Sequence, residues 1–221
     1  MTRACVVIRC HESAVGFSTH CELHKRHLRR HGHPEQKGVT VGELRPFLDR
    51  VSARRTKNPD NPTWRLLDRR WNALTEHATV MLETSSTGSP MVSYERQAAQ
   101  NLMSLRDSVP TQSVIDVSLG MFVFNEQRPG RFKSDKAFSF QLARRVRALA
   151  DVNTGRTWSA KEGRVKRTYR DVPPRVLDCL AASLTVAFGV AGLRLAEMEL
   201  REAAGQRAEH LELRDALKEM T

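Results

Sequence analysis

The chain has 221 residues, 40% of them hydrophobic and 28% charged, and a formal net charge of +11. That length is enough to bury a sizeable core in one or two domains. The large excess of Lys and Arg favours a polyanionic partner, most simply nucleic acid.

Neither an export signal nor a membrane anchor is predicted. The first ten residues contain Arg3 and Arg9. The longest apolar run, 176–195, includes Asp178 and Arg194, and the 15 residues between these charges are too few for a membrane span, which needs about 20. We therefore expect a cytoplasmic protein, with a buried core helix over this run and with reduced thiols available to a metal.

The charge is distributed in blocks along the chain. Residues 1–60 contain 12 basic and 6 acidic residues, and residues 131–175 contain 13 and 4, so these blocks carry net charges of +6 and +9. Residues 61–130 and 176–221 carry −1 and −3. A merely solvated surface would spread its charge more evenly, so the two basic blocks are candidate contact regions.

The N-terminal segment carries a metal-ligand pattern. Cys5, Cys10, Cys21 and His24 have the spacing C-x4-C-x10-C-x2-H, in which two short-spaced pairs are separated by a loop. Three sulfurs and one imidazole nitrogen suit zinc better than magnesium or calcium. We therefore predict one structural Zn²⁺ per chain, whose four protein ligands leave no open position for chemistry.

Other interpretations of this segment are weaker. Unligated core cysteines would need an apolar surrounding that so polar a segment lacks. A disulfide framework does not suit the three cysteines of this segment, an odd number, in a chain for which no export signal is predicted. The sequence leaves the fourth ligand of the Cys3His set open, because His11, His20 and His27 compete with His24.

The spacing C-x4-C-x10-C-x2-H, followed by basic residues and the sequence RRHGHP, resembles a small zinc-finger module. This module recurs in phage and mobile-element proteins, including the flanks of some HNH-type homing endonucleases. The resemblance covers about residues 1–35, including Arg29, Arg30, Gly32 and Pro34. It implies a structural zinc and a helix that faces nucleic acid.

After the finger, the sequence predicts helices. Thr40 and Glu43 form a T-x-x-E capping box at the start of the first. We expect this helix to end before 53–61, a basic and then Pro- and Asn-rich stretch typical of a linker or a phosphate-contacting loop. Asn61-Pro62 begins a second helix, with apolar residues at helical spacing from Leu67 to Met81.

Three further helices are expected before residue 151. A polar break over 83–90 precedes one that begins at Ser89-Pro90, and another begins around Pro110. Ser134 caps the next, which is predicted to expose Lys136, Arg144, Arg145 and Arg147.

The second basic block is predicted to contain a β-hairpin. Residues 156–159 and 164–170 favour strands and flank a turn that contains Gly163. A basic helix followed by a basic hairpin is the order of a winged helix, in which the helix enters the major groove and the hairpin contacts phosphates. A solvated surface on a helical core remains the alternative. The predicted nucleic-acid contacts in the two blocks are Lys25, Arg26, Arg29, Arg30, Lys133, Lys136, Arg144, Arg145, Arg147, Arg164, Lys166 and Arg167.

The expected fold class is mainly α, with a small N-terminal zinc finger, a helical domain that carries a winged-helix-like β-hairpin, and a long C-terminal helix. The predicted divisions are a finger over 1–36, a helix and basic linker over 37–60, a helical domain over 61–195 with the basic hairpin or loop at 151–174, and an acidic amphipathic helix over 196–221. That last helix is typical of a short coiled coil or a partner-binding tail.

No catalytic constellation is recognisable in the sequence. A phosphate-binding Gly-rich loop, a nucleophile elbow and a second metal cluster are all missing from it. The sequence therefore predicts a non-enzymatic, zinc-containing protein of a phage, plasmid or other mobile element that binds DNA or RNA. The alternative is a protein–protein module, a subunit or inhibitor of a nucleoprotein complex such as a phage-defence or counter-defence assembly. An HNH-type nuclease is least favoured, because beyond His33 only His77 and His210 remain.

Overall fold

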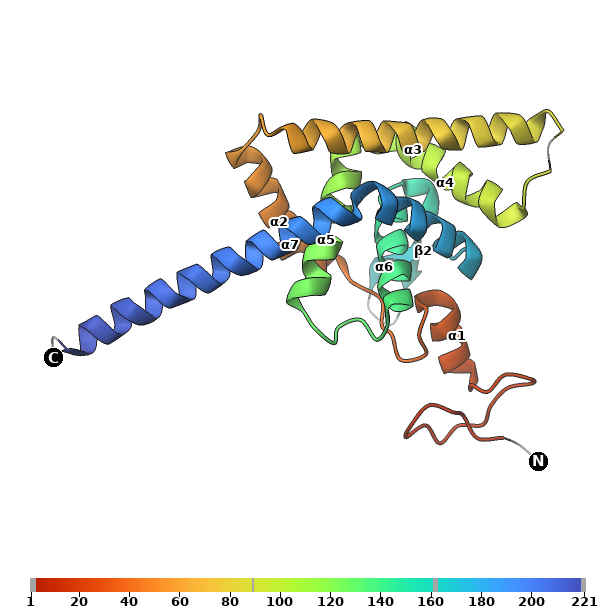
Figure 1. Cartoon of the computed structure of the whole chain (residues 1–221). Coiled ribbons are helices and arrows are strands. Elements are labelled where there is room, and N and C mark those ends of the chain that lie inside the picture. Colours follow the sequence, from red (N-terminus) through yellow and green to blue (C-terminus); the bar gives the residue numbers. More distant parts are fainter. Residues whose placement is uncertain (1–2, 89, 161–162, 220–221) are drawn as a thin grey trace.

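A computed structural model of the chain describes residues 3–88, 90–160 and 163–219 (Figure 1). The fold is mainly helical with a small antiparallel hairpin and a long C-terminal helix, as the sequence predicts. Its elements are α1 (Glu22–His31), α2 (Val41–Lys57), α3 (Pro62–Ser86), α4 (Ser93–Ser108), α5 (Thr111–Gln127), α6 (Asp135–Arg147), the 3-10 turn η1 (Asp151–Asn153), β1 (Thr154–Ser159), β2 (Arg164–Tyr169) and α7 (Pro174–Glu219).

Helix α5 is the centre of the core. It is buried on nearly every side, because α2, α3, α6 and α7 all pack around it. Its sequence between Val114 and Phe124 is almost entirely apolar, and Asp116 within it forms an ion pair with Arg55 of α2. A helix that is apolar all round needs such surroundings.

Helix α2 begins where the sequence predicts, but it is longer than expected. The backbone N–H of Glu43 donates to Thr40 Oγ1 at 3.1 Å and the N–H of Thr40 donates to Glu43 Oε2 at 2.8 Å, which confirms the capping box. The prediction of a linker or phosphate-contacting loop from residue 53 is wrong, because the helix continues to Lys57. Arg54 and Arg55 are held there by carboxylates of α7 and α5.

The polar break predicted over 83–90 begins later than expected. Helix α3 continues to Ser86, and in its last turns the hydroxyl of Thr84 donates to the carbonyl of Val80 at 2.7 Å. The next helix, α4, begins at Ser93 and not at residue 89, which lies outside the described residues.

Helix α7 is a single helix of 46 residues that begins at Pro174 and crosses position 195 without a break. Its first half packs on α4, α5 and α6, and at Gly192 it comes so close to α5 that an added Cβ would lie 2.6 Å from the ring of Phe122. The predicted core helix over 176–195 is therefore confirmed on one face, whereas the prediction that its other faces are also covered by helices is wrong. Val186 and Val190 are 80% and 68% exposed, and Leu193 is exposed as well.

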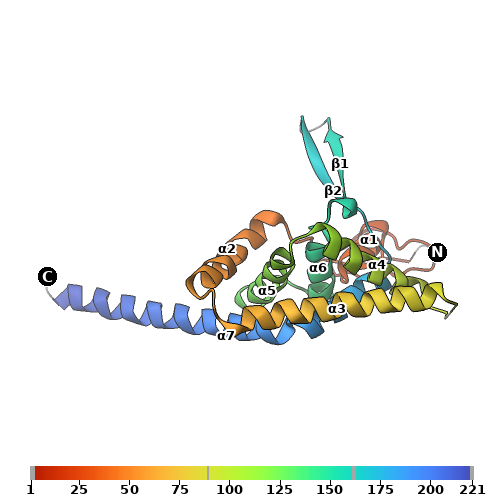
Figure 2. The same cartoon turned by 90° about the horizontal axis from the view of Figure 1, so that it is seen from above.

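The predicted hairpin is present and projects from the helical body (Figure 2). Strands β1 and β2 are antiparallel, with Trp158 opposite Val165, and the turn contains Gly163 in the left-handed region, at φ 60°. Trp158 is 63% exposed, whereas Tyr169 at the base packs against α6. The two aromatic side chains therefore do not pack on each other.

Within the part of the chain that the structure describes, one helix meets the length and composition of a membrane span. It is α7 over Pro174–Arg214, and half of its most apolar 18-residue window is buried inside the molecule. Core helices of soluble proteins have the same properties, and α7 supplies core residues such as Leu180, Leu184 and Phe188.

Candidate metal centre and basic surface

The residues before α1 fold into a compact loop. Ala4 and Ser13 form an isolated antiparallel bridge, and the backbone N–H of Cys5 donates to the carbonyl of Glu12 at 3.0 Å. The N–H of Val6 donates to the carbonyl of Thr19, also at 3.0 Å. These bonds fix a segment whose own apolar side chains lie outside the helical core.

A tight turn brings the first two cysteines together. Arg9 adopts the left-handed conformation, with φ 64°, and the N–H of Cys10 donates to the carbonyl of Val7 at 3.0 Å. A non-glycine residue seldom adopts this conformation unless its surroundings require it. Here it directs Cys10 back toward Cys5.

The second pair of ligands comes from the start of α1. Cys21 is the N-cap residue and His24 lies three residues later, so their side chains are on the same face of the first turn. The N–H of Lys25 donates to the carbonyl of Cys21 at 2.9 Å, which closes that turn. The helix thus sets the spacing of the C-x2-H pair.

The four predicted ligands converge. The Sγ atoms of Cys5, Cys10 and Cys21 and the Nδ1 atom of His24 all lie within 4.8 Å of one another. Cys10 Sγ is 3.9 Å from Cys21 Sγ, and His24 Nδ1 is 3.4 Å from Cys5 Sγ and 3.3 Å from Cys21 Sγ. In a tetrahedral zinc site, bond lengths of about 2.3 Å to sulfur and 2.0–2.1 Å to nitrogen place ligand atoms about 3.6–3.8 Å apart. The residues therefore fit a zinc ion.

The electrostatics of the cluster also favour a cation. Burial raises the pKa of Cys5, but backbone groups of Cys21 and Val7 and the ring of His24 outweigh it and lower this pKa to about 6. A backbone contact with Glu12 lowers the pKa of Cys10, whereas burial and the adjacent thiols of Cys5 and Cys21 outweigh it, so this pKa is raised. Three thiols this close resist joint deprotonation, and a bound divalent ion removes the conflict.

The competing histidines are placed elsewhere. His11 is exposed, and His20 Nδ1 lies 3.0 Å from the hydroxyl of Thr19. His27 makes an edge-to-face contact with His31, with ring centroids 5.7 Å apart. Among the described residues, His24 is the histidine that belongs to the cysteine cluster.

The end of α1 is fixed to α6 by close packing. Gly32 is left-handed at φ 77°, and a Cβ on it would lie 2.7 Å from the carbonyl oxygen of Lys136. The amide of Gln141, which is buried, lies with Nε2 2.9 Å from His31 Nδ1, and its Oε1 accepts from the N–H of Val39. Burial, followed by the charge of Arg144, lowers the pKa of His31 to about 4, so the ring is neutral and accepts from Gln141.

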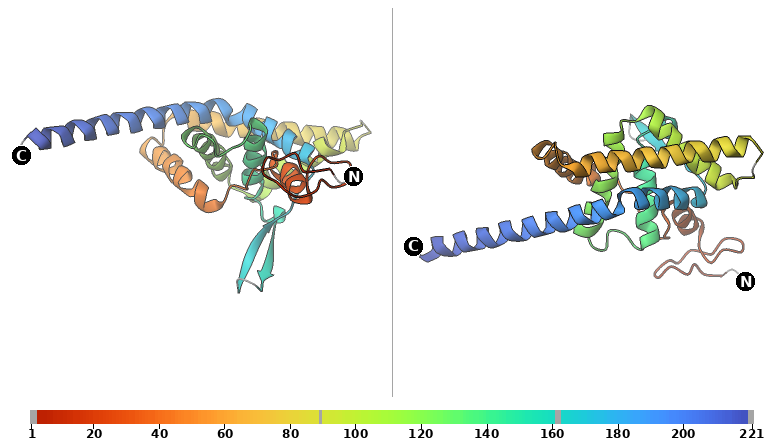
Figure 3. Two further views of the ribbon diagram at one scale, coloured as in Figure 1. Left: turned by 90° about the horizontal axis from the view of Figure 1, so that it is seen from below. Right: turned by 45° about the horizontal axis from the view of Figure 1, so that its top comes forward.

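Asp171 joins the two basic blocks. It lies just after β2 and forms ion pairs with Arg30 of α1 and, at 2.7 Å, with Arg144 of α6. Burial raises its pKa, but the guanidinium groups of Arg144 and Arg30 hold this pKa below its usual value. Residues 1–60 and 131–175 therefore meet at the base of the hairpin, with the finger and β1–β2 adjoining there (Figure 3).

The predicted nucleic-acid contacts divide into three groups. Lys25, Arg26, Arg29 and Arg30 of α1 and Lys133 and Lys136 near the start of α6 are exposed, although Arg30 is paired with Asp171 and Lys136 lies 3.8 Å from Asp178. Arg164, Lys166 and Arg167 lie on β2, but their side chains lie outside the described residues.

The third group, the three arginines near the end of α6, is less exposed than the sequence predicts. Arg147 is only 5% exposed, and it donates to Asn101 Oδ1 and to the carbonyl of Arg170. Arg144 is paired with Asp171 and lies over the ring of Tyr169, 4.0 Å from its centroid. Arg145 is half-buried. The prediction that α6 exposes Arg147 is wrong, because the base of the hairpin folds over this end of the helix, so α6 does not present its basic end to a groove.

Several residues that shape this region were missed by sequence reasoning. Gln141, His31 and Asp171 connect α1 to α6 and to the hairpin. An isolated acidic residue within a strongly basic block was a signal for Asp171. No comparable signal marked the amide of Gln141.

Comparisons with protein-family models, with curated proteins and with solved structures gave no match.

Proposed function

We propose that this protein binds nucleic acid through a face formed by α1, the start of α6 and the β1–β2 hairpin, and that a structural zinc ion holds α1 in place. The observation that carries the proposal is the contact of Arg30 and Arg144 with Asp171, which links two strongly basic blocks from distant parts of the sequence. Phosphate contacts from several such cations add, and they position a protein on a polyanion without reading its sequence.

The zinc ion would be held by Cys5, Cys10, Cys21 and His24. It would supply structural cross-linking of the loop to α1, because a Cys3His site with four protein ligands has no open position for a substrate. Lys25, Arg26 and Arg29 then project from the outer side of α1 as exposed cations. In this account the contact helix is α1 and not α6, and the hairpin contacts phosphates beside it.

The mode of action proposed is binding without catalysis, in the cytoplasm of a cell that carries a phage, plasmid or other mobile element. The origin rests on the resemblance of the finger alone.

The experiment is a fluorescence-anisotropy titration of labelled duplex DNA, single-stranded DNA and RNA with the zinc-loaded full chain. We expect binding that weakens as salt increases, because counterions are released from neutralised phosphates. The combined substitutions Lys25→Ala, Arg26→Ala and Arg29→Ala should weaken binding by at least about tenfold. A matched variant that removes Arg45, Arg65 and Arg128, three exposed arginines outside the finger and the hairpin, should bind as the wild type.

An equal loss of nucleic-acid affinity in both triple variants would show that only the net charge matters. Wild-type affinity in the α1 variant would show that the finger is not part of the interface. Absence of binding to all three nucleic acids would refute the proposal.

A second candidate function is a protein–protein module within a nucleoprotein complex. It is favoured by apolar side chains on the surface of the finger, where Ile8 is 86% exposed and Phe17 is fully exposed. A pull-down from source cells, with and without nuclease treatment, separates the two. Partners that survive nuclease support this second function, and partners lost with the nucleic acid support the first.

A further inference from the structure

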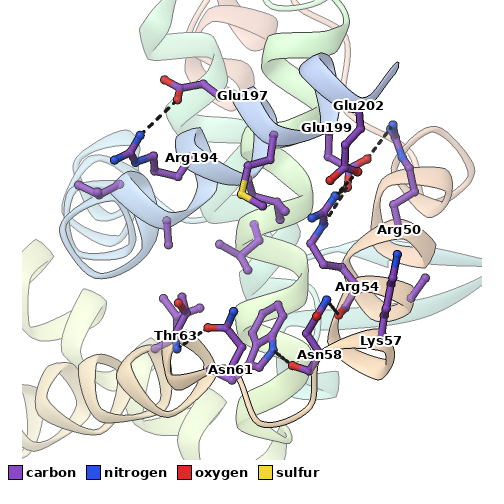
Figure 4. A pocket seen from close by; sticks show the side chains of 18 of the residues that line it. Arg50, Arg54, Lys57, Asn58, Asn61, Thr63, Arg194, Glu197, Glu199 and Glu202 are labelled. Carbon is purple, nitrogen blue, oxygen red and sulfur yellow. Dashed lines mark hydrogen bonds and ion pairs between the residues drawn. The ribbon is translucent and has the colours of Figure 1, made fainter. Parts of the chain in front are cut away.

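One of the three tryptophans of the chain lies on the surface, on the hairpin. Trp71 is 1% exposed in the helical core. Trp64 lines a groove between α2, α3 and α7, where its Nε1–H donates to the carbonyl of Asn58 at 2.9 Å (Figure 4). Trp158 of β1 is 63% exposed, although tryptophan is on average a highly buried residue. Its indole ring is therefore accessible to a ligand.

Trp158 belongs to an apolar pair on one face of the hairpin. It lies opposite Val165, which is 58% exposed. Successive residues of a strand alternate between the two faces, so Arg156, Arg167 and Tyr169 occupy the same face as this pair. The face begins at Tyr169, which packs on α6, and it reaches the apolar pair about 13 Å farther out, at about 3.3 Å per residue.

The cations of the hairpin have no acidic residue opposite them. The six cross-strand pairs contain no carboxylate and four cations, which are Arg156, Arg164, Lys166 and Arg167. Arg156 lies directly opposite Arg167, and like charges in that arrangement destabilise a pair of strands. A two-stranded hairpin that stands alone is also only marginally stable in water. An anionic ligand that covers the apolar pair would relieve both conditions.

We propose that Trp158 stacks on an unpaired nucleobase, so that the hairpin directs the protein to single-stranded or locally unpaired nucleic acid. Every base has a π-face, and aromatic side chains on the face of a sheet are a common platform for single strands. The cations of the hairpin would hold the phosphates beside that base. An apolar protein surface would leave these cations without partners, whereas a nucleotide supplies both a flat ring and an anion.

The place of Trp158 on the hairpin favours an unpaired base over a base pair. Side chains of a strand stand roughly perpendicular to the sheet, so Trp158 projects from the face of the hairpin and not from its tip. The tip, residues 160–163, has the sequence AKEG, which contains no large apolar side chain that could separate stacked base pairs. In an intact duplex the faces of the bases are covered by their neighbours. The indole ring therefore finds an accessible partner where a base is already unstacked.

Because this proposal rests on the nucleic-acid binding proposed above, the test compares two ligands of nearly equal charge. The zinc-loaded full chain is titrated with a labelled duplex and with the same duplex carrying a central bulge of unpaired bases. Phosphate contacts contribute to both affinities. Stacking on one base should make the bulged ligand bind more tightly by about fivefold or more. This preference in DNA, in RNA or in both supports the proposal.

Substitutions of Trp158 separate stacking from an ordinary apolar contact. Trp158→Phe keeps an aromatic ring and should keep the preference for the bulge. Trp158→Leu keeps an apolar partner for Val165 but cannot stack, so it should lose the preference and bind the intact duplex with wild-type affinity. Val80→Ala, at a 58% exposed valine of α3, is the matched control and should leave both affinities unchanged.

Tryptophan fluorescence gives a second readout that does not depend on affinity. The bulged ligand should quench the wild type more than Trp158→Phe, since the difference between these two proteins reports the indole of Trp158. The intact duplex should quench both proteins equally. Equal quenching by the bulged ligand as well would show that no base stacks on Trp158.

Wild-type preference for the bulge in Trp158→Leu would overturn the proposal. So would an equal loss of affinity for both ligands, since Trp158 would then contact paired nucleic acid. In both cases salt-dependent binding of the intact duplex would still support the proposed function, whereas absence of all binding would refute that function and this proposal together. Unchanged nucleic-acid affinities, with loss of a nuclease-resistant partner from a pull-down with Trp158→Leu, would assign Trp158 to a protein contact instead.

Discussion

His24 is one of six histidines among the first 34 residues, and its position on the first turn of α1 decides its role. From there its Nδ1 lies 3.3 Å from Cys21 Sγ, whereas His11 points to solvent and His31 contacts Gln141. A candidate metal ligand is thus distinguished by the turn that carries it and by the cysteines that face it.

Substitution of a ligand should therefore lower the zinc affinity much more than substitution of a neighbouring histidine. Cys21→Ser should lower zinc affinity by more than the 10- to 100-fold that loss of an outer-shell partner typically costs, and His11→Ala should leave it unchanged. Competition with a chromophoric zinc chelator measures both. Unchanged affinity in the Cys21 variant would contradict the assigned ligands.

The imidazole of His31 should titrate far below the ordinary range. Burial, followed by the charge of Arg144, lowers its pKa in the fold from 6.5 to about 4. A lowered histidine pKa means that the unfolded chain binds the proton more readily, so this contribution to stability is full above pH 6.5 and is lost as the pH falls from 6.5 to 4.

An NMR pH titration of the His31 ring in the zinc-loaded protein should return a pKa of about 4. A pKa of 6.5 or higher would show that the ring is not enclosed between α1 and α6 as described.

At the scale of elements, two glycines of α7 have opposite surroundings. An added Cβ at Gly192 would lie 2.6 Å from the ring of Phe122, whereas at Gly205 it would meet open space. Gly192→Ala should therefore destabilise the fold by about 1–3 kcal/mol through overpacking against α5. Gly205→Ala should keep the stability or raise it by up to about 1 kcal/mol, since alanine favours a helix.

Chemical denaturation of the two variants measures both effects. Equal stability of the Gly192 variant and the wild type would contradict the close approach of α5 and α7.

Much of the element order could be predicted because its signals are local. The capping box at Thr40, Pro62 at the start of α3, and Ser134 before α6 each act within one turn of the chain. The metal cluster was equally readable, since its ligands are close in sequence.

What could not be predicted depends on tertiary contacts. Arginine is usually a surface residue, yet Arg147 is buried, because Asn101 and the carbonyl of Arg170 accept its hydrogen bonds. Valine is usually a core residue in so apolar a segment, yet Val186 is exposed. In both cases the burial depends on which distant segments pack at that position, so no window of sequence contains the information.

At the scale of the whole molecule, the basic residues and the Cys3His cluster belong to one structural unit. The finger contributes α1, which rests on α6 through Gly32 and His31, and Asp171 ties α1 to the base of the hairpin. Removal of zinc with a chelator should therefore unfold residues 1–35 locally and leave the helical core intact, because the core cluster contains no residue of the finger. Elemental analysis should find one zinc per chain in protein purified without chelator. A value far below one, or loss of most helical circular dichroism on chelation, would contradict this account.

The salt dependence of duplex-DNA affinity tests the central claim most directly. This dependence is measured for four proteins. They are the wild type, the α1 variant lacking Lys25, Arg26 and Arg29, the hairpin variant lacking Arg164, Lys166 and Arg167, and the combination of both. If α1 and the hairpin contact phosphates on one face, the slope of log affinity against log salt should flatten by about one unit per lost contact in each triple variant, and by the sum of both changes in the combination. An unchanged slope in either triple variant, at unchanged melting temperature, would contradict a shared phosphate-binding face.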